Sequence, residues 1–253
     1  MSKARNILCI VTDHQVRVAD PALAGQFSLQ SELARLGVNF ERAYSVLPVC
    51  SPARASMLTG LYPHAHGLTE NDGRFGGREG LELSDWTIGR AFNGAGYRCG
   101  WFGKWHVDNQ LSAGDYGFEG FSLPGYGYPY GTAAYRDYLE RRELKPPVAT
   151  VESAGESGKG PGTRIDLCSA PNWYDYESGS AVLDGPAQTH EAFFIADLAA
   201  RWLGSLEDQP FFLRVDTWGP HPPYILAEPY LDRIADLNPG LPANFATDLM
   251  HRP

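Results

Sequence analysis

Short apolar stretches alternate along this chain with longer segments of helical periodicity. Apolar, β-branched runs that end in polar residues predict strands at residues 6–12, 97–102 and 210–216. Apolar positions spaced for one helix face predict helices at residues 28–36, 84–93 and 190–206. This alternation favours an α/β fold with a mainly parallel or mixed central sheet and helices on both of its faces. We expect residues 6–12, with their unbroken apolar core, to form a buried central strand.

The stretch between the second and third predicted strands has a different composition. Residues 125–188 are rich in Gly, Tyr, Pro and Ser and show little periodicity. We expect a long loop-rich excursion there, with one helix near residues 133–142. No internal repeat divides the chain, so residues 1–253 are predicted to form one domain.

A further helix is predicted directly after Cys50. Ser51 is a suitable N-cap, Pro52 suits the first helical position, and Gly60 ends the pattern. We therefore expect Cys50 just before a helix N-terminus.

Polar side chains gather where the predicted strands end. Asp13 and His14 follow the first strand, Lys104 and His106 follow the second, and His221 lies in the Pro-rich loop after the third. In open α/β sheets the loops at the carboxyl ends of the strands converge, and ligands bind there. These residues are candidates for one shared site.

Composition limits the possible partners of that site. The 30 acidic and 21 basic residues give a formal net charge of -9, without a long basic run. We therefore expect neither nucleic acid nor a membrane surface as a partner. An anionic ligand would need a local cluster of Arg, Lys and His.

The cysteines and the N-terminus bear on the cellular compartment. Cys9, Cys50, Cys99 and Cys168 are far apart and form no C-x-x-C pair, which favours free thiols over a zinc ribbon or a disulfide framework. The first residues lead straight into the first apolar run without the pattern of a secretory signal. A cytoplasmic location is expected.

Two motifs carry a family resemblance. The segment from Cys50 to Gly60 reads C-S-P-A-R-A-S-M-L-T-G and resembles the sulfatase signature C-x-P-x-R followed by x-x-x-L-T-G. Residues 96–106, which end in G-K-W-H, resemble the second signature of the same family. The resemblance implies an alkaline phosphatase-like fold and the N-terminal part of a sulfatase catalytic domain.

The resemblance also implies a chemistry. In this family the signature Cys, here Cys50, is oxidised to formylglycine by a formylglycine-generating enzyme, and one hydroxyl of the hydrated aldehyde attacks the sulfur of a small-molecule or carbohydrate sulfate ester. Arg54 is implied to hold the diol, Lys104 to contact sulfate and nucleophile, His106 to act as base, and His221 to bind the bridging oxygen.

A divalent cation, in most members calcium, is implied as cofactor. Its expected ligands here are Asp13 and Cys50 as formylglycine. Many members have a second Asp where this chain has His14, and an imidazole is a poor ligand for calcium, so either His14 is not a ligand or the metal differs. The family's later ligands and a later sulfate-binding lysine have no counterpart before Pro253. We therefore expect a domain incomplete at its C-terminus, and little or no activity from these residues alone.

Three functions remain open from the sequence. The first is sulfate ester hydrolysis. The second is hydrolysis of a phosphodiester or phosphonate ester by the same superfamily chemistry. The third is a binding domain or inactive fragment that keeps the motif. A Cys-dependent phosphatase loop is excluded, because it needs five residues between Cys and Arg, whereas three separate Cys50 from Arg54.

Overall fold

The three predicted strands pair in one parallel sheet in the computed structural model of the chain. They are β1 (Ile7–Val11), β2 (Arg98–Gly103) and β7 (Phe211–Asp216), and the short β3 (Glu119–Phe121) joins them. The order across the sheet is β1-β7-β2-β3. The structure describes residues 4–15, 28–153, 159–169, 179–228 and 230–235.

Contacts divide the chain into two units. The first comprises residues 1–15 and 44–228, and the second residues 16–43 and 229–253. The described helices of the second unit are α2 (Ser28–Leu36), which confirms the helix predicted at those residues, and α8 (Tyr230–Ala235). Both sheets and every candidate site residue belong to the first unit.

The central position in the parallel sheet belongs to β7. We expected β1 to be a buried central strand, and this was wrong: β1 pairs with β7 alone among the described strands, and Leu8 and Ile10 are 53% and 52% exposed. Residues 211–216 insert between β1 and β2, although they are the last of this sheet's strands along the chain. An unbroken apolar run indicates a strand, but it does not specify which neighbours the strand acquires.

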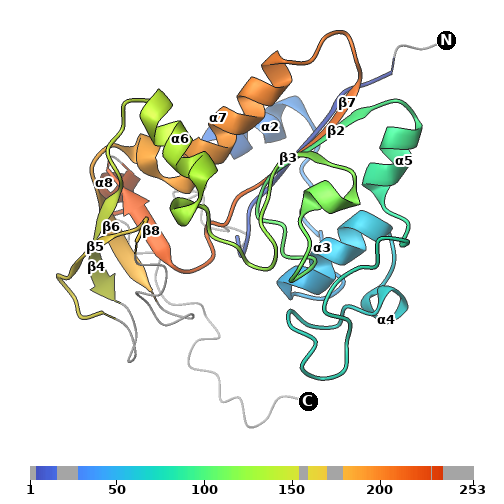
Figure 1. Cartoon of the computed structure of the whole chain (residues 1–253), viewed down its shortest axis with the longest axis horizontal. Helices are drawn as coiled ribbons and strands as arrows, with labels where there is room; N and C mark the ends of the chain where they lie inside the picture. Colours follow the sequence, from blue (N-terminus) through green and yellow to red (C-terminus); the bar gives the residue numbers. More distant parts are fainter. Residues whose placement is uncertain (1–3, 16–27, 154–158, 170–178, 229, 236–253) are drawn as a thin grey trace. The chain divides into compact units, whose positions relative to one another are not determined.

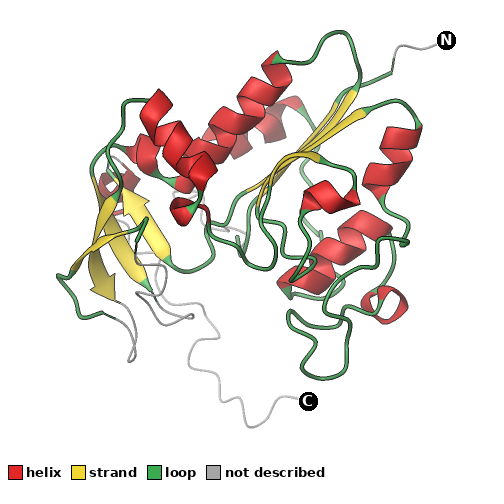
Figure 2. Ribbon diagram, in the orientation of Figure 1, coloured by secondary structure: helices red, strands yellow, loops and turns green. Residues whose placement is uncertain are grey.

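Helices cover both faces of this sheet, as predicted (Figure 1). On one face α7 (Glu191–Gly204) packs against β2, β3 and β7; on the other, α5 (Ile88–Gly94) packs against β2 and is contacted by α3 (Cys50–Thr59). Adjacent strand residues alternate between two cores, with Leu213 facing the α7 side and Phe212 the α3 side. Figure 2 shows these layers by secondary structure.

Two helices begin at other residues than expected. Ser51 is not the N-cap of α3: Val49 is the cap and Cys50 is the first helical residue. Ser84 does not begin α5 either, because the Thr87 side chain caps it by accepting from the Arg90 amide at 3.3 Å. Several polar residues near each helix start are compatible with a cap, and only the folded backbone selects one. The remaining short helical elements are α4 (Pro63–His66), η1 (Ala113–Tyr116), η2 (Pro129–Gly131) and η3 (Ala187–Thr189).

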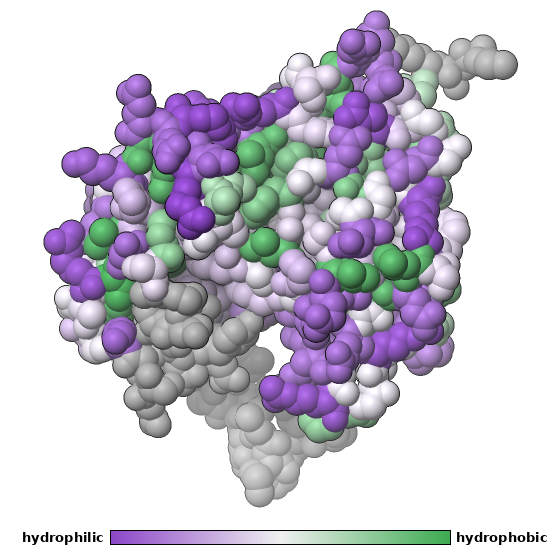
Figure 3. All heavy atoms as spheres, in the orientation of Figure 1, coloured by the Kyte–Doolittle hydropathy of each residue, from purple (hydrophilic) through white to green (hydrophobic). Residues whose placement is uncertain are grey.

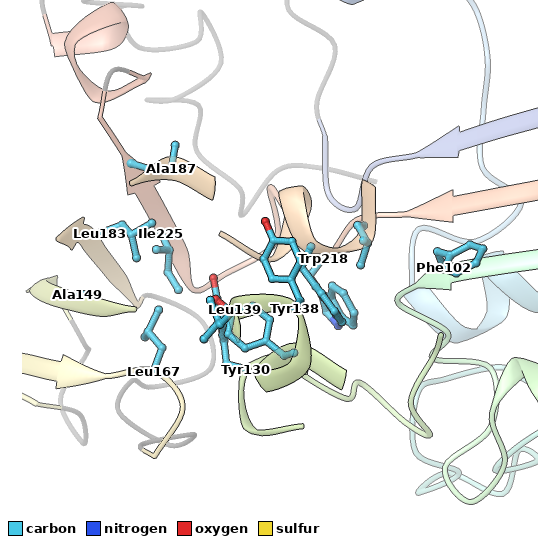
Figure 4. Close-up of a cluster of buried hydrophobic side chains, with 14 of the residues drawn as sticks. Phe102, Tyr130, Tyr138, Leu139, Ala149, Leu167, Leu183, Ala187, Trp218 and Ile225 are labelled. Atoms are coloured by element: carbon cyan, nitrogen blue, oxygen red, sulfur yellow. The ribbon is translucent and has the colours of Figure 1, made fainter. Parts of the chain in front are cut away.

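The segment predicted as a loop-rich excursion contains three of the four strands of a second sheet. Its helix is confirmed as α6 (Ala133–Arg141), but β4 (Val148–Ser153), β5 (Arg164–Asp166) and β6 (Ser180–Asp184) were missed. These strands form the order β5-β4-β6-β8, with β8 at Tyr224–Ala227. Figure 4 shows the core beneath it, where Ala149, Leu183 and Ile225 meet the tyrosines around α6. Short strands that pair far along the chain leave little local period to detect.

On the face drawn in Figure 3 polar residues predominate, and the apolar ones fall into several small areas. Within the described ranges, no helix has the length and apolar character needed to cross a bilayer.

A buried carboxylate between α6 and α7 makes a pH-dependent contribution to stability. Asp197 accepts from Arg141 Nη1 at 3.2 Å and from Arg142 Nε at 3.0 Å. Burial opposes its ionisation, but the two arginines outweigh burial and lower the pKa of Asp197 below its ordinary value. The stabilisation is therefore present above the unfolded pKa of about 4 and is lost as pH falls through the folded pKa.

We expect Asp197→Asn to lower the melting temperature at neutral pH and to flatten its decline between about pH 5 and about pH 2. Thermal unfolding across that range measures this. Asp184→Asn is the control, because Asp184 pairs with the exposed Arg164. Parallel declines for Asp197→Asn and the unchanged protein would contradict the expectation.

Candidate active site

The carboxyl ends of β1, β7 and β2 lie level with one another. Val11 and Gly103 both pair with Asp216 in the register of the sheet. Asp13 follows β1, and its amide donates to the carbonyl of Gly219 at 3.1 Å; Lys104 follows β2, and its amide donates to the carbonyl of Asp216 at 2.9 Å. The loops after the three strands are thus tied together, as expected for a site at this edge of the sheet.

Cys50 lies at the start of α3, among polar groups from those loops. Its side chain is nearly buried, at 9% exposure. The sulfur lies 3.8 Å from Asp13 Oδ1, 3.8 Å from Lys104 Nζ and 3.9 Å from His14 Nε2. Burial raises the pKa of the Cys50 thiol; Lys104 and Arg54 oppose this rise and Asp13 adds to it. The unmodified thiol is therefore not activated as a thiolate. In the converted residue, the sulfur's place would be taken by the oxygens on the same carbon.

Lys104 and Asp13 form a buried ion pair beside Cys50. Lys104 is fully buried, and its ammonium donates a hydrogen bond to Asp13 Oδ2. The same ammonium lies 4.1 Å from the centre of the Tyr126 ring. Burial opposes the ionisation of Asp13, yet Lys104 and Arg54 lower the pKa of Asp13 below its ordinary value. Asp13 is therefore a carboxylate at neutral pH.

Arg54 is held by groups that the sequence did not reveal. Its Nη1 donates to the Lys104 carbonyl at 2.9 Å and to Asp216 Oδ2 at 2.8 Å. Its Nη2 lies 4.0 Å from Asp13 Oδ2. Asp216 also binds Arg214. It is the last residue of β7, and Asp13 follows the end of β1 in a similar way. This position at a strand end is the sequence feature from which Asp216 could have been predicted as a site residue.

His106 is a buried imidazole on the same edge. It is 7% exposed, and its Nδ1 has no hydrogen-bond partner among the described residues. Burial, with the charges of Lys104 and Arg54, lowers the pKa of His106 to about 3. The ring is therefore neutral at pH 7, and the same surroundings disfavour its protonated form.

His14 and His221 complete the cluster. Their ring centres lie 4.1 Å apart. His221 Nδ1 lies 2.7 Å from the Pro222 carbonyl oxygen. A carbonyl oxygen only accepts hydrogen bonds, so Nδ1 is the donor. The Tyr126 hydroxyl lies 3.2 Å from the same nitrogen. Tyr126 thus contacts His221 as well as Lys104.

The described residues fit a calcium site poorly on their own. The donor atoms of His14, Cys50 and His221 lie within 4.8 Å of one another, but they are nitrogen and sulfur. Calcium takes six to eight oxygen ligands. Within the described ranges Asp13 is the carboxylate beside Cys50, and Lys104 already binds it. Asp13 by itself supplies too few oxygen ligands for calcium.

Comparison with known proteins agrees with the two sequence motifs. The sulfatase family matches residues 5–244. The chain is 29% identical to a protein named "Uncharacterized sulfatase YidJ" from Escherichia coli (strain K12), over 99% of this chain and 45% of that protein. It therefore spans less than half the length of this relative.

Solved structures share the fold at low sequence identity. A protein in complex with its substrate D-glucosamine-2-N,6-O-disulfate aligns with a TM-score of 0.59 at 20% identity, covering 96% of this chain and 40% of that one. The phosphonate monoester hydrolase of Agrobacterium radiobacter aligns with a TM-score of 0.54 at 21% identity, covering 90% and 44%. These similarities confirm the alkaline phosphatase-like fold. Because the family match covers nearly the whole chain, and both motifs meet at the edge of the sheet, this chain belongs to the sulfatase family.

Proposed function

We propose that this chain carries the reacting centre of an enzyme that hydrolyses sulfate esters through formylglycine made from Cys50. One observation carries the proposal: the signature cysteine lies at the start of α3 with Lys104 Nζ and Asp13 Oδ1 each 3.8 Å from its sulfur. A cation beside the attacking atom and a second cation, Arg54, one helical turn away suit an anionic substrate.

The modified residue would supply a hydrated aldehyde as oxygen nucleophile. Arg54 and Lys104 would stabilise the negative charge on that oxygen and on the sulfate, because both are fixed in a site with little access to water. His106, whose Nδ1 has no partner among the described residues, would accept a proton, although its buried surroundings disfavour the charged ring. His221 would contact the bridging oxygen, while its Nδ1 stays bound to the Pro222 carbonyl.

A divalent cation belongs to the proposal, and calcium is the expected one. Asp13, Cys50 as formylglycine and, if the metal tolerates nitrogen, His14 are the proposed ligands. The cation would supply positive charge next to the sulfate. We also propose a cytoplasmic location, since all four cysteines lie in described residues and are free thiols.

The proposed substrate is a small-molecule or carbohydrate sulfate ester. Support comes from the structural relative whose substrate is a sulfated glucosamine. A phosphodiester or phosphonate ester is the second candidate, since a phosphonate monoester hydrolase shares the fold. Parallel assays with an aryl sulfate, a phosphodiester and a phosphonate ester distinguish the two by the largest kcat/KM. A binding domain or inactive fragment would turn over none of them, and measurements of metal binding and thermal unfolding separate it from an active enzyme.

We expect Cys50 to be converted to formylglycine when the chain is co-expressed with a formylglycine-generating enzyme, because the C-x-P-x-R sequence is complete. Peptide mass spectrometry measures the replacement of the thiol by an aldehyde. Cys99 and Cys168, which lack the motif, are internal controls and should stay thiols. Unmodified Cys50, under conditions that convert a known sulfatase, would contradict the proposal.

A further inference from the structure

Asp216 is a fully buried carboxylate to which the proposed chemistry assigns no role. It lies at the end of the central strand β7, with 0% exposure. It binds two guanidinium groups, those of Arg54 and Arg214. Burying a charge away from water costs free energy unless close partners compensate it. The partners of Asp216 therefore indicate its role.

Arg54 uses the two ends of its guanidinium differently. Nη1 is occupied by two acceptors, Asp216 Oδ2 at 2.8 Å and the Lys104 carbonyl at 2.9 Å. Nη2 lies instead 4.0 Å from Asp13 Oδ2, the oxygen that is 4.0 Å from the Cys50 sulfur. A planar guanidinium anchored at one nitrogen has its other nitrogen fixed in direction. The anchor on Asp216 therefore fixes the other end of Arg54 beside Asp13, which neighbours Cys50.

Arg214 neutralises the anchor. It donates to Asp216 from two nitrogens, Nε at 3.1 Å to Oδ1 and Nη2 at 2.6 Å to Oδ2. This two-point pairing is the stronger form of an arginine–carboxylate bond. Since Arg214 and Asp216 cancel each other's charge, the positive charge of Arg54 is left for the site.

A tryptophan ties this network to Lys104. The Arg214 guanidinium lies 4.3 Å from the centre of the Trp101 ring. Trp101 Nε1 donates to the Lys104 carbonyl at 3.2 Å, and that carbonyl also accepts from Arg54. Every member of the network is therefore fixed by at least one other.

We propose that Asp216 is a positioning residue, which holds Arg54 beside Asp13 and Cys50 while Arg214 serves as the counter-ion of Asp216. What Arg54 does for the reaction rests on the proposed function. The positioning of Arg54 by Asp216 does not depend on the proposed function. An experiment can therefore contradict either proposal without contradicting the other.

Kinetics of an extended, formylglycine-containing chain on an aryl sulfate test the consequence for catalysis. We expect Asp216→Asn to lower kcat about tenfold or more without raising KM, because Arg54 is no longer held in position while no positive charge is removed. In an Arg54→Lys background the same change should alter kcat by less than about twofold, since its effect passes through Arg54. Equal losses in both backgrounds would overturn the proposal.

Asp197→Asn is the matched control. Asp197 is also a buried carboxylate bound by two arginines, Arg141 and Arg142, but it lies on α7 in a groove lined by none of the candidate site residues. It should change stability and leave kcat and KM within about twofold. If it lowered kcat as much as Asp216→Asn does, loss of any buried ion pair would explain both, and the proposal would fail.

A second readout needs no turnover. In the unmodified chain, NMR should show slowly exchanging guanidinium signals from Arg54, identified by their loss in Arg54→Lys. Asp216→Asn should remove them, and Asp197→Asn should not. Signals that persist in Asp216→Asn would overturn the proposal. If the extended, formylglycine-containing chain hydrolyses no sulfate ester, the proposed function fails, and these signals still decide the role of Asp216.

A second, charge-balanced variant keeps the test decisive if Asp216→Asn does not fold. Asp216→Asn leaves Arg54 and Arg214 buried without their carboxylate, whereas Asp216→Asn with Arg214→Met removes one charge of each sign. We expect this double variant to fold and still to lose the Arg54 signals. Retention of the signals in the folded double variant would show that Asp216 does not hold Arg54.

Discussion

Replacing Lys104 with alanine in an extended, formylglycine-containing chain should lower turnover at least about a hundredfold, because a fixed cation beside the proposed nucleophile is removed from a site with little water. The Lys104 ammonium lies 3.8 Å from the Cys50 sulfur and binds Asp13. Kinetics on an aryl sulfate measure the loss. Lys145→Ala, which removes an exposed lysine, is the control and should have little effect.

Stability should fall as well in the Lys104 variant. Asp13 would lose the nearer of its two cations and keep only Arg54, at 4.0 Å, and breaking a buried pair costs roughly 3 kcal/mol. Lys104→Met combined with Asp13→Asn removes both charges and should recover most of the stability without the activity. A Lys104→Ala protein that is less stable but turns over normally would contradict the assignment.

His106→Ala should have a similar effect on rate by a different route. His106 is neutral, and no described residue bonds its Nδ1, so its loss breaks no ion pair. Removal of a positioned base typically lowers the rate about a hundredfold or more.

Gly103→Ala should be the most destabilising single change at this edge of the sheet. Gly103 has φ 112°, and an added Cβ would lie 1.9 Å from the Asp216 carbonyl oxygen and 2.9 Å from its carbon. That carbonyl oxygen also accepts a hydrogen bond from the Lys104 amide. Strands β2 and β7 therefore cannot move apart without displacing Lys104. We expect a loss of about 3 kcal/mol or more, or no folding at all, because backbone strain and a backbone clash act together.

Gly60→Ala is the control for this change. Gly60 ends α3 with φ 70°, and an added Cβ would meet nothing within 4 Å, so only the conformational cost applies. That cost is about 1 kcal/mol. Denaturant unfolding of both variants measures the difference. Equal losses of unfolding free energy in Gly103→Ala and Gly60→Ala would mean that the contact between the added Cβ and the Asp216 carbonyl does not destabilise the fold.

The local sequence was sufficient to predict several parts of this protein. Apolar runs indicated the three long strands of the parallel sheet, and periodic segments indicated α2, α6 and α7. The polar residues at the strand ends, Asp13 and Lys104, were predicted to meet, and they do. This prediction succeeds because the carboxyl ends of parallel strands lie at one edge whatever their order. The signature motif added Cys50 and Arg54, since residues four apart on a helix share a face.

The tertiary structure decided what depends on partners far along the chain. It placed β7 rather than β1 at the centre of the parallel sheet and built a second sheet within residues that have little local period. It joined Arg54 to Asp216, 162 residues later, and Tyr126 to His221, 95 residues later. A strand's neighbours and a buried charge's partner are selected by the burial and pairing of the whole fold. Periodicity within one segment carries no information about either, because it reflects only which face of that segment is apolar.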